Sequence, residues 1–488
     1  MKSLLRRLLS GRGVAETLIR ALVGSSGLRL LGVGFSFLVG IQLARGLGVE
    51  GYGIYGLAMS IIAVLTIPTE FGLPQLLTRE VAAAQSRGDF GRIRTIIRWG
   101  RKVVLSTSAI LAGLVLTYLW LSGEGVSSTL GMTIIAGLGM IPLVAVGNLQ
   151  SASLRGLQHI VKGQLPDTLA RPALYSAMLW SAALLSQLGA PYVAMSLGAA
   201  AAAGSCVLAG LLLRRVLPKG EASEQVPDHK RQWLRSAFPM ALTEGMRVLQ
   251  AHSVVLLLGL FSTSAMVGYY RVATSVSLFI ALVVTIFNIV VGPVISRLYA
   301  QSELEQIQRV LKGVALGMTG GTLALAFPFV LAGQWIVTLA FGDAFANAAS
   351  PLGVLCVGSI AASIFGGPAV VLNMTGYERR VTRASMISMA VLLLLGLPMV
   401  YVDGATGAAW ASVCSTMVWQ MTMWWDCRRF VGVDSSILSC VVSRGRAQIV
   451  VPGISRGGIR AATVGPQALG IAPPERRRSD RRERSDEA

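Results

Sequence analysis

Apolar residues along this chain of 488 residues occur in long blocks, and short polar gaps separate the blocks. A helix needs about 20 apolar residues to cross the hydrocarbon core of a bilayer, and the pattern predicts twelve such helices. The strands of a membrane barrel would alternate apolar and polar residues instead, which these blocks do not do. The chain is therefore expected to be an all-α integral membrane protein. The predicted spans are residues 21–45, 52–78, 99–121, 129–152, 168–188, 191–213, 234–260, 265–294, 310–332, 349–373, 382–402 and 404–426.

Basic residues are concentrated in every second gap. All but four of the 43 lysines and arginines lie in the N-terminal segment, in alternate gaps or in the C-terminal segment. The other gaps hold mainly acidic residues, such as Glu50, Glu124, Asp343 and Asp403. Because Lys and Arg are retained on the cytoplasmic side of a membrane, both termini are predicted to be cytoplasmic.

The composition agrees with a membrane protein. Hydrophobic residues make up 53% of the chain and charged residues 14%, with a mean hydropathy of +0.64. Soluble domains carry about 25% charged residues, so an ordinary soluble enzyme, a disulfide scaffold and a disordered protein are excluded. The net charge of +20 would suit nucleic acid. Basic gaps between apolar blocks indicate membrane topology instead, and no nucleic-acid partner is expected.

The longest inner gap divides the predicted spans into two sets of six. The expected organisation is a cytoplasmic lead-in at 1–20, a six-helix lobe at 21–213 and a cytoplasmic linker at 214–233. A second six-helix lobe follows at 234–428, and a basic cytoplasmic tail at 429–488 is expected to be disordered. The lead-in is basic and has no cleavage site after a short apolar core, so it is not interpreted as a signal peptide.

The two predicted lobes share a short motif. Residues 53–60 (GIYGLAMS) and 268–275 (GYYRVATS) both read G-x-Y-x-[LV]-A-x-S, and the copies lie 215 positions apart. Six spans separate them, so both copies have the same orientation, as in a parallel repeat. Transporters built from such repeats bind their substrate between the repeats, and a central cavity between the lobes is therefore expected.

Several further motifs carry a family resemblance. They are LARGLGVEGYGIY at 43–55, EFGL at 70–73, TRE at 78–80, LRGLQ at 154–158, FGDAF at 341–345 and LNMTGY at 372–377. Over about 15–428 the chain resembles polysaccharide transporters, the O-antigen-type flippases of lipid-linked oligosaccharides. Their superfamily also contains the lipid II flippase and the multidrug and toxin extruders.

The resemblance implies a function in surface polysaccharide biosynthesis. Such a protein flips a lipid-linked (polyprenyl diphosphate) oligosaccharide across the cytoplasmic, or inner, membrane by alternating access. Its partners would be that substrate, membrane lipids and the polysaccharide polymerase or chain-length machinery. The chain has no P-loop, so a gradient of H⁺ or Na⁺ is the expected driving force. Related flippases use basic residues on the first helix of a lobe to hold the pyrophosphate.

Three charged residues inside predicted spans are the candidate substrate-binding residues: Arg29, Glu244 and Arg247. Charges at membrane depth are costly and usually face a cavity or a partner. The repeat offset carries Arg29 onto position 244, so both lobes place charge at equivalent depth. Arginine suits phosphate oxygens. The alternative is that Glu244 and Arg247, at i and i+3 on one helix face, simply neutralise each other. Glu244 is also a candidate proton or sodium site.

Glu70 and Arg271 are candidates for a gate or for ion coupling. Glu70 precedes Gly72 and Pro74, which are expected to break the helix there. An interfacial carboxylate is the alternative for Glu70, and it is the favoured interpretation. Arg271 either lines the exit or extends to the membrane interface, and the second interpretation is favoured. His252 is interpreted as a helix-packing residue.

Other classes of function are disfavoured by what the sequence lacks. It has no HExxH motif and no cluster of Cys and His, so no metal and no cofactor beyond a coupling ion are expected. No Ser, His and Asp arrangement indicates a hydrolase, and the protein is predicted not to be an enzyme. A multidrug or toxin-type exporter of small molecules, with the same fold, is the alternative. It would favour acidic residues in its cavity. A glycan polymerase or ligase would need a large outer loop.

Overall fold

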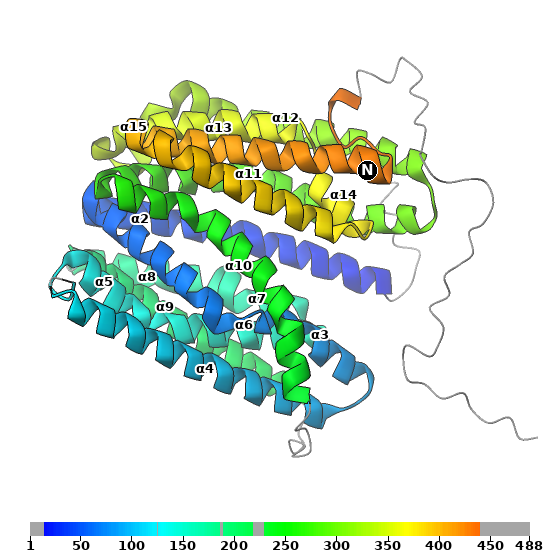
Figure 1. Ribbon diagram of the computed structural model, residues 1–488, viewed down its shortest axis with the longest axis horizontal. Helices are drawn as coiled ribbons and strands as arrows, with labels where there is room; N and C mark the ends of the chain where they lie inside the picture. Colours follow the sequence, from blue (N-terminus) through cyan, green and yellow to red (C-terminus); the bar gives the residue numbers. More distant parts are fainter. Residues whose placement is uncertain (1–13, 124, 186–188, 218–228, 440–488) are drawn as a thin grey trace, which may run out of the picture. The chain divides into compact units, whose positions relative to one another are not determined.

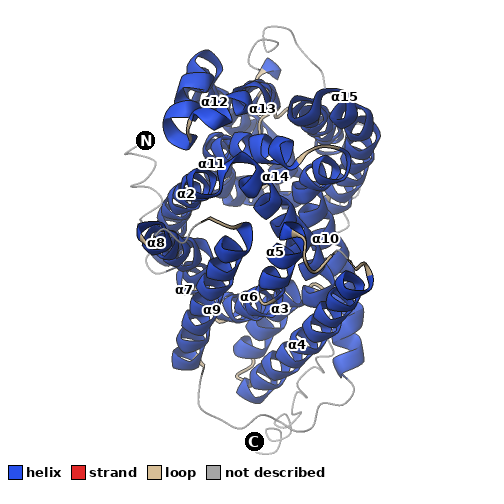
Figure 2. Cartoon of the chain, turned by 90° about the vertical axis from the view of Figure 1, so that its left-hand side faces the viewer, coloured by secondary structure: helices blue, strands red, loops and turns tan. Residues whose placement is uncertain are grey.

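A computed structural model describes residues 14–123, 125–185, 189–217 and 229–439. Within these ranges the regular elements are helices, and no strand occurs (Figure 2). The prediction of an all-α integral membrane protein is thereby confirmed. Three predicted segments lie partly outside the described residues. These parts are residues 1–13 of the lead-in, residues 218–228 of the linker and residues 440–488 of the tail.

The elements follow one another in the order shown in Figure 1. They are α2 (Val14–Glu70), α3 (Leu73–Ser86), α4 (Phe90–Leu121), α5 (Thr129–Leu138), α6 (Met140–Gly156), α7 (Ile160–Leu165), η1 (Pro166–Ala170), α8 (Arg171–Leu184), α9 (Pro191–Val216), α10 (His229–Phe261), α11 (Ser264–Ala300), α12 (Leu304–Phe341), η2 (Asp343–Ala348), α13 (Ala349–Ser363), α14 (Pro368–Met374), α15 (Glu378–Asp426) and η3 (Cys427–Val431).

Nine helical segments in the described part of the chain are long and apolar enough to cross a membrane. Three of them contain a break, at Gly48 in α2, Ala332 in α12 and Gly404 in α15. Gly48 in α2 has φ 68°, and Gly404 in α15 has φ 52°, so each of these helices consists of two segments. Glycine suits the breaks at Gly48 and Gly404 because it adopts positive φ at little steric cost. These two breaks fall between predicted spans one and two and between spans eleven and twelve. The count of twelve crossings and the orientation of the termini stay predictions.

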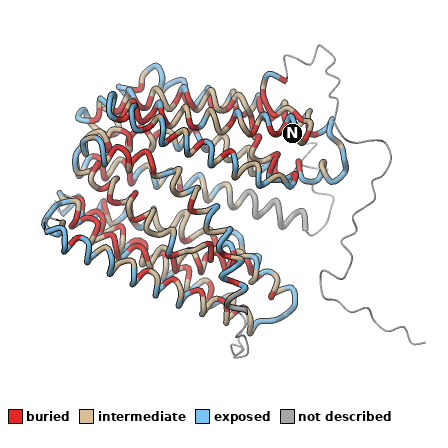
Figure 3. Tube along the Cα trace, viewed as in Figure 1, coloured by how far each residue is buried: buried red, intermediate tan, exposed pale blue. Residues whose placement is uncertain are grey.

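Large apolar side chains remain exposed along the outer helices. On α4 the side chains of Ile110, Leu114, Tyr118 and Trp120 are more than half exposed. Figure 3 shows exposed positions recurring along this helix. An extended apolar surface of this kind would aggregate in water and suits contact with lipid.

The helices of the described unit form two groups (Figure 1). Helices α3 to α9 form the first group, and α11 to α15 form the second. Helix α10 belongs to both, because Trp233 and Ala237 are buried in a core with α3, α4 and α6, whereas Val254 and Leu258 are buried in a core with α15. The predicted second lobe therefore begins within the packing of the first group. Hydropathy identifies a span but not its neighbours.

Helices α2 and α11 cross at the two copies of the repeat motif. A Cβ atom on Gly53 would lie 1.7 Å from the Ser264 carbonyl oxygen, and a Cβ atom on Gly268 would lie 2.4 Å from that of Val49. The two contacts are equivalent to each other under the repeat, since 49 and 264, like 53 and 268, are 215 positions apart. The two halves therefore meet at one end of the bundle in a symmetric backbone contact that only glycine permits.

Polar contacts strengthen the same end. Arg45 donates to the carbonyl oxygens of Leu339 and Ala340, at 2.6 and 2.8 Å, in the last turn of α12. These carbonyls have no partner within the helix, and a cation near a helix C-terminus is stabilising. The rings of Tyr52 and Phe345 are 6.3 Å apart. This end of the bundle, which we call the closed end, thus joins α2 to α11, α12 and η2.

The first part of the predicted tail is ordered. Residues 432–439 leave η3 and pack against the second group of helices. Asp434 accepts a hydrogen bond from Trp424 Nε1 at 2.8 Å, and its backbone exchanges two hydrogen bonds with the Gln308 carboxamide. The backbone nitrogen of Ile437 donates to Ile364 at 2.9 Å. The expected boundary at 429 is therefore too early, because local composition does not reveal these tertiary contacts.

Candidate functional site

A cavity of about 540 Å³ lies between α2, α6, α8, α10 and α11. We call it the central cavity. Its lining combines apolar side chains with converging polar and charged ones, as is typical of ligand sites. The polar residues of its lining are Ser36, Tyr55, Thr66, Glu70, Asn148, Asp167, Arg171, Tyr175, Glu244, Arg247, His252 and Arg271.

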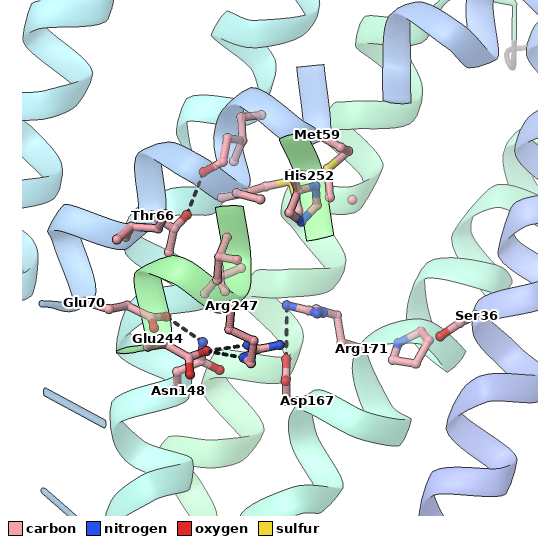
Figure 4. Close-up of a pocket in the computed structure, with 18 of the residues that line it drawn as sticks. Ser36, Met59, Thr66, Glu70, Asn148, Asp167, Arg171, Glu244, Arg247 and His252 are labelled. Carbon is pink, nitrogen blue, oxygen red and sulfur yellow. Dashed lines mark hydrogen bonds and ion pairs between the residues drawn. The ribbon is translucent and has the colours of Figure 1, made fainter. Parts of the chain in front are cut away.

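Glu244 and Arg247 form an ion pair on α10, and both line the central cavity. Arg247 Nε donates to Glu244 Oε1 at 2.9 Å, while Gln75 Nε2 lies 3.4 Å from the other carboxylate oxygen. The predicted pairing at i and i+3 is thus present. It does not remove either residue from the cavity, since the Arg247 side chain stays 69% exposed. In Figure 4 this side chain lies between Glu244 and a second ion pair.

That second ion pair joins Arg171 Nη1 to Asp167 Oδ1 at 3.1 Å. The two residues stand at i and i+4, and both line the central cavity. Asp167 belongs to η1, a π-helical turn that begins at Pro166, and Arg171 precedes Pro172. Such π-helical turns inside helices occur frequently at functional sites. The sequence feature that could have marked this part of the cavity is a pair of prolines next to a charged pair, in a span of low hydropathy.

Glu70 lies at the end of α2 and also lines the central cavity. Its Oε1 accepts a hydrogen bond of 2.6 Å from Asn148 Nδ2 of α6. The chain turns directly afterwards, with φ 42° at Phe71 and φ 69° at Gly72, so the expected helix break is present. A Cβ atom on Gly72 would lie 2.6 Å from the Ala237 carbonyl oxygen of α10. Glycine therefore allows this turn to lie against α10.

Arg271 lines the central cavity from α11, and its role as an exit or interface residue stays a prediction. Its Nε atom is buried and has no hydrogen-bond partner among the described residues. The side chain has room because it passes over Gly56, where a Cβ atom would lie 2.9 Å from Arg271 Cγ. These two residues are repeat equivalents, so Arg271 occupies the symmetric crossing itself.

Aromatic and imidazole side chains form the wall beside Arg271. The Tyr175 hydroxyl donates to the Ala194 carbonyl oxygen at 2.9 Å and lies 3.1 Å from the Tyr55 hydroxyl. His252 Nδ1 is 3.1 Å from Ser60 Oγ, a residue of the first motif copy. The interpretation of His252 as a packing residue fits this bond, although its ring also lines the cavity.

Arg29 does not line the central cavity. It lies in a second hollow of about 590 Å³, which we call the side alcove. The alcove lies between α2, α7, η1 and α11, and Arg155 contributes a second guanidinium to it. Ser36 and Asp167 line both hollows, so the two adjoin. The expected juxtaposition of Arg29 and Arg247 is thus replaced by two neighbouring cationic sites.

These features define the class of the protein. Long apolar helices in two groups, a motif repeated on α2 and α11, and a charged cavity beside the crossing of these two helices make a multi-pass membrane protein with a transporter fold. The chain belongs to the polysaccharide biosynthesis protein family, whose family model matches residues 24–299.

Two solved structures share this fold. The lipid II flippase MurJ, in an inward closed conformation, has a TM-score of 0.66 at 11% identity, covering 88% of this chain and 94% of MurJ. A multidrug resistance transporter of the MATE family and MOP superfamily, inward-facing, has a TM-score of 0.63 at 14% identity. The match covers 86% of this chain and 100% of that transporter. At these identities the likeness concerns the fold alone.

Two curated proteins are similar in sequence. The stage V sporulation protein B of Bacillus subtilis is 25% identical over 215 residues, which are 43% of this chain and 39% of that protein. The chain thus matches well under half of the length of this relative. The probable low-salt glycan biosynthesis flippase Agl15 of Haloferax volcanii is 23% identical over 400 residues, which are 80% of this chain and 79% of that protein.

Proposed function

We propose that this protein flips a lipid-linked oligosaccharide, carried on a polyprenyl diphosphate, across the cytoplasmic membrane for surface polysaccharide biosynthesis. The glycan and its diphosphate would pass through the central cavity while the lipid chain stays in the bilayer. The two halves would alternate access by rocking around the central cavity. Membership of the polysaccharide biosynthesis family and the similarity to a probable glycan flippase support this substrate class.

The balance of charge in the two hollows carries the proposal. Together the central cavity and the side alcove are lined by five arginines and three acidic residues. The arginines are Arg29, Arg155, Arg171, Arg247 and Arg271, and the acids are Glu70, Asp167 and Glu244. Two of the arginines are held in ion pairs within the cavity, by Asp167 and Glu244.

The other three arginines, Arg29, Arg155 and Arg271, have no ion pair within the described ranges. An unpaired guanidinium in a low-dielectric site has a strong preference for an anionic ligand. A diphosphate provides several acceptor oxygens that match the planar fork of arginine. A cationic drug would instead meet an excess of like charge.

We also propose that an ion gradient drives the cycle. Glu70 and Glu244 both line the central cavity, and each has an amide donor on one carboxylate oxygen. A proton or a sodium ion bound there would change the charge of the cavity between the two states. This makes both residues the candidates for coupling.

The test replaces Arg29 and Arg271 with glutamine, together, in the native host. Glutamine keeps a polar side chain but removes the charge, so the diphosphate loses two partners. We expect lipid-linked oligosaccharide to accumulate and surface polysaccharide to fall by at least tenfold, while the amount of protein in the membrane is unchanged. Arg101→Gln, on the exposed surface of α4, is the matched control and should leave both quantities at the wild-type level.

Two results would contradict the proposal. One is normal surface polysaccharide from the Arg29→Gln, Arg271→Gln protein. The other is unchanged glycan on deletion of the gene together with increased sensitivity to cationic dyes, which would indicate the small-molecule exporter instead.

A further inference from the structure

A third hollow lies within the second group of helices. It has a volume of about 300 Å³ and is lined by residues of α11, α12, α13 and α15. This volume is at the low end of about 300–1,000 Å³ found for small-molecule pockets, so it suits a small group rather than a whole oligosaccharide. Its polar lining residues are Thr285, Thr322, Ser359, Ser363, Ser412, Thr416, Trp419 and Gln420. We call it the hydroxyl-lined chamber.

None of the described residues that line this chamber is charged. The hydroxyls of Ser359, Thr416 and Thr285 each donate to a backbone carbonyl of their own helix, at 2.7, 2.9 and 2.9 Å. A hydroxyl that has donated its hydrogen still offers oxygen lone pairs. The chamber therefore presents mainly acceptors, which an anion would not bind. A cation would find no carboxylate to compensate its burial.

Thr322 supplies the complementary group. Its side chain is fully buried at the chamber wall, and its Oγ1 atom has no hydrogen-bond partner in the described part of the chain. An unpartnered buried hydroxyl is unfavourable, and it can donate to a ligand as well as accept from it. Gln420 is also buried, and its Nε2 donates to the Ala362 carbonyl oxygen at 3.1 Å. Several acceptors together with a free donor match a neutral ligand with hydroxyl groups.

The chamber adjoins the cationic side alcove. Ala281 and Thr285 of α11 line both hollows. A ligand whose anionic group is held by Arg29 would therefore have a neutral, hydroxyl-rich compartment directly beyond this part of α11. The anionic part and the neutral part of one ligand would therefore bind in two separate, adjoining hollows.

We propose that the hydroxyl-lined chamber binds an uncharged sugar residue of the transported glycan while the diphosphate is held among the arginines. This inference rests on the proposed function and adds to it the preference for a neutral sugar near the diphosphate. Thr322 and the acceptor hydroxyls of Ser359 and Thr416 would contact the sugar hydroxyls.

The test measures binding to the full-length protein in lipid nanodiscs with three probes. They are farnesyl diphosphate, the same lipid diphosphate carrying a neutral disaccharide, and its counterpart carrying a hexuronic acid. We expect the neutral conjugate to bind about tenfold more tightly than farnesyl diphosphate, which corresponds to about 1.4 kcal/mol. The hexuronic conjugate should show no such gain, because the chamber has no cation.

The double variant Thr322→Val, Thr416→Val removes two hydroxyls at nearly constant volume. It should bind farnesyl diphosphate as the wild type does and lose the gain for the neutral sugar, to within about twofold. Thr338→Val is the matched control, since this hydroxyl also lies on α12 and bonds to the Trp335 carbonyl oxygen but does not line the chamber. If the double variant does not fold, Ser359→Ala provides the same comparison with a smaller change.

The outcomes separate the two hypotheses. Binding of farnesyl diphosphate without any gain from the neutral sugar would overturn the chamber's role alone. A gain that persists in the double variant, or an equal gain for the hexuronic conjugate, would do so as well. Absence of binding by all three probes would overturn the proposed function and this inference with it.

Discussion

The crossing of α2 and α11 makes a sharp prediction about Gly53. In Gly53→Ala, the new Cβ atom would lie 1.7 Å from the Ser264 carbonyl oxygen, whereas an ordinary contact is at least 3.4 Å. The two helices must therefore move apart by about 1.7 Å to restore an ordinary contact between these two atoms. The obstacle is backbone, so no side-chain rotation can relieve it. Gly268→Ala, at the equivalent position of the second copy, should have the same effect through Val49.

The expected energy follows from this clash. Overpacking a tight contact costs about 1–3 kcal/mol. Because the clash exists only while the closed end is shut, this cost falls on the closed conformation. An equilibrium between closed and open conformations would then shift toward the open one by about 5- to 150-fold. A population that is minor in the wild type would become readily measurable.

The assay is a distance measurement across the closed end. Glu50 and Asn347 are exposed and lie close to Tyr52 and Phe345, whose rings are 6.3 Å apart. Spin labels on Glu50→Cys and Asn347→Cys, in a background without other cysteines, should show a larger long-distance population in Gly53→Ala. Gly113→Ala in α4 is the control, since no atom lies within 4 Å of its new Cβ. Identical distance distributions in Gly53→Ala, Gly113→Ala and wild type would refute the reasoning.

Two further predictions concern single hydrogen-bonded carboxylates. Asn148→Ala should lower stability by about 1–3 kcal/mol in thermal unfolding, because the half-buried Glu70 carboxylate loses its amide donor. Adding Glu70→Gln should restore part of the loss, and no recovery would contradict this account. Asp434→Ala should speed backbone hydrogen exchange of residues 432–439 by about 5- to 30-fold, since it releases the Trp424 indole. Arg428→Ala, which removes a 3.8 Å contact to Asp434 and a cation–π contact of 5.0 Å to the Trp424 ring, should have a smaller effect, and equal effects would count against the assignment.

The helical membrane class could be predicted from the sequence because lipid imposes a one-dimensional rule. A spanning segment must be apolar and long and must satisfy its own backbone hydrogen bonds, and each of these demands is local. The helix break after Glu70 was predictable for the same reason, since Gly72 lies within a few residues of the turn that it permits. The pairing of Glu244 with Arg247 was equally local, at i and i+3 on one helix.

The composition of the site could not be predicted in the same way. Arg29 and Arg247 were expected together, and the structure separates them, because the packing of α2 against η1 and α11 decides which hollow Arg29 enters. Asn148 contacts Glu70 from 78 positions away, and no local pattern marks that bond. The packing of the start of α10 with the first group likewise depends on Trp233, which lies in the predicted linker just before the predicted span 234–260.

The repeat explains both the symmetry of the fold and the asymmetry of its cavities. At positions 53 and 268 both copies carry glycine, and the two halves meet alike. Three positions later the copies differ, with Gly56 in one half and Arg271 in the other. Two arginines at this crossing would repel each other, and two glycines would leave the space without charge. One glycine and one arginine allow a guanidinium from the second half to enter a cavity lined mainly by the first. Arg271 thereby adds positive charge to the central cavity. The hydroxyl-lined chamber between α11, α12, α13 and α15 is lined by neutral residues.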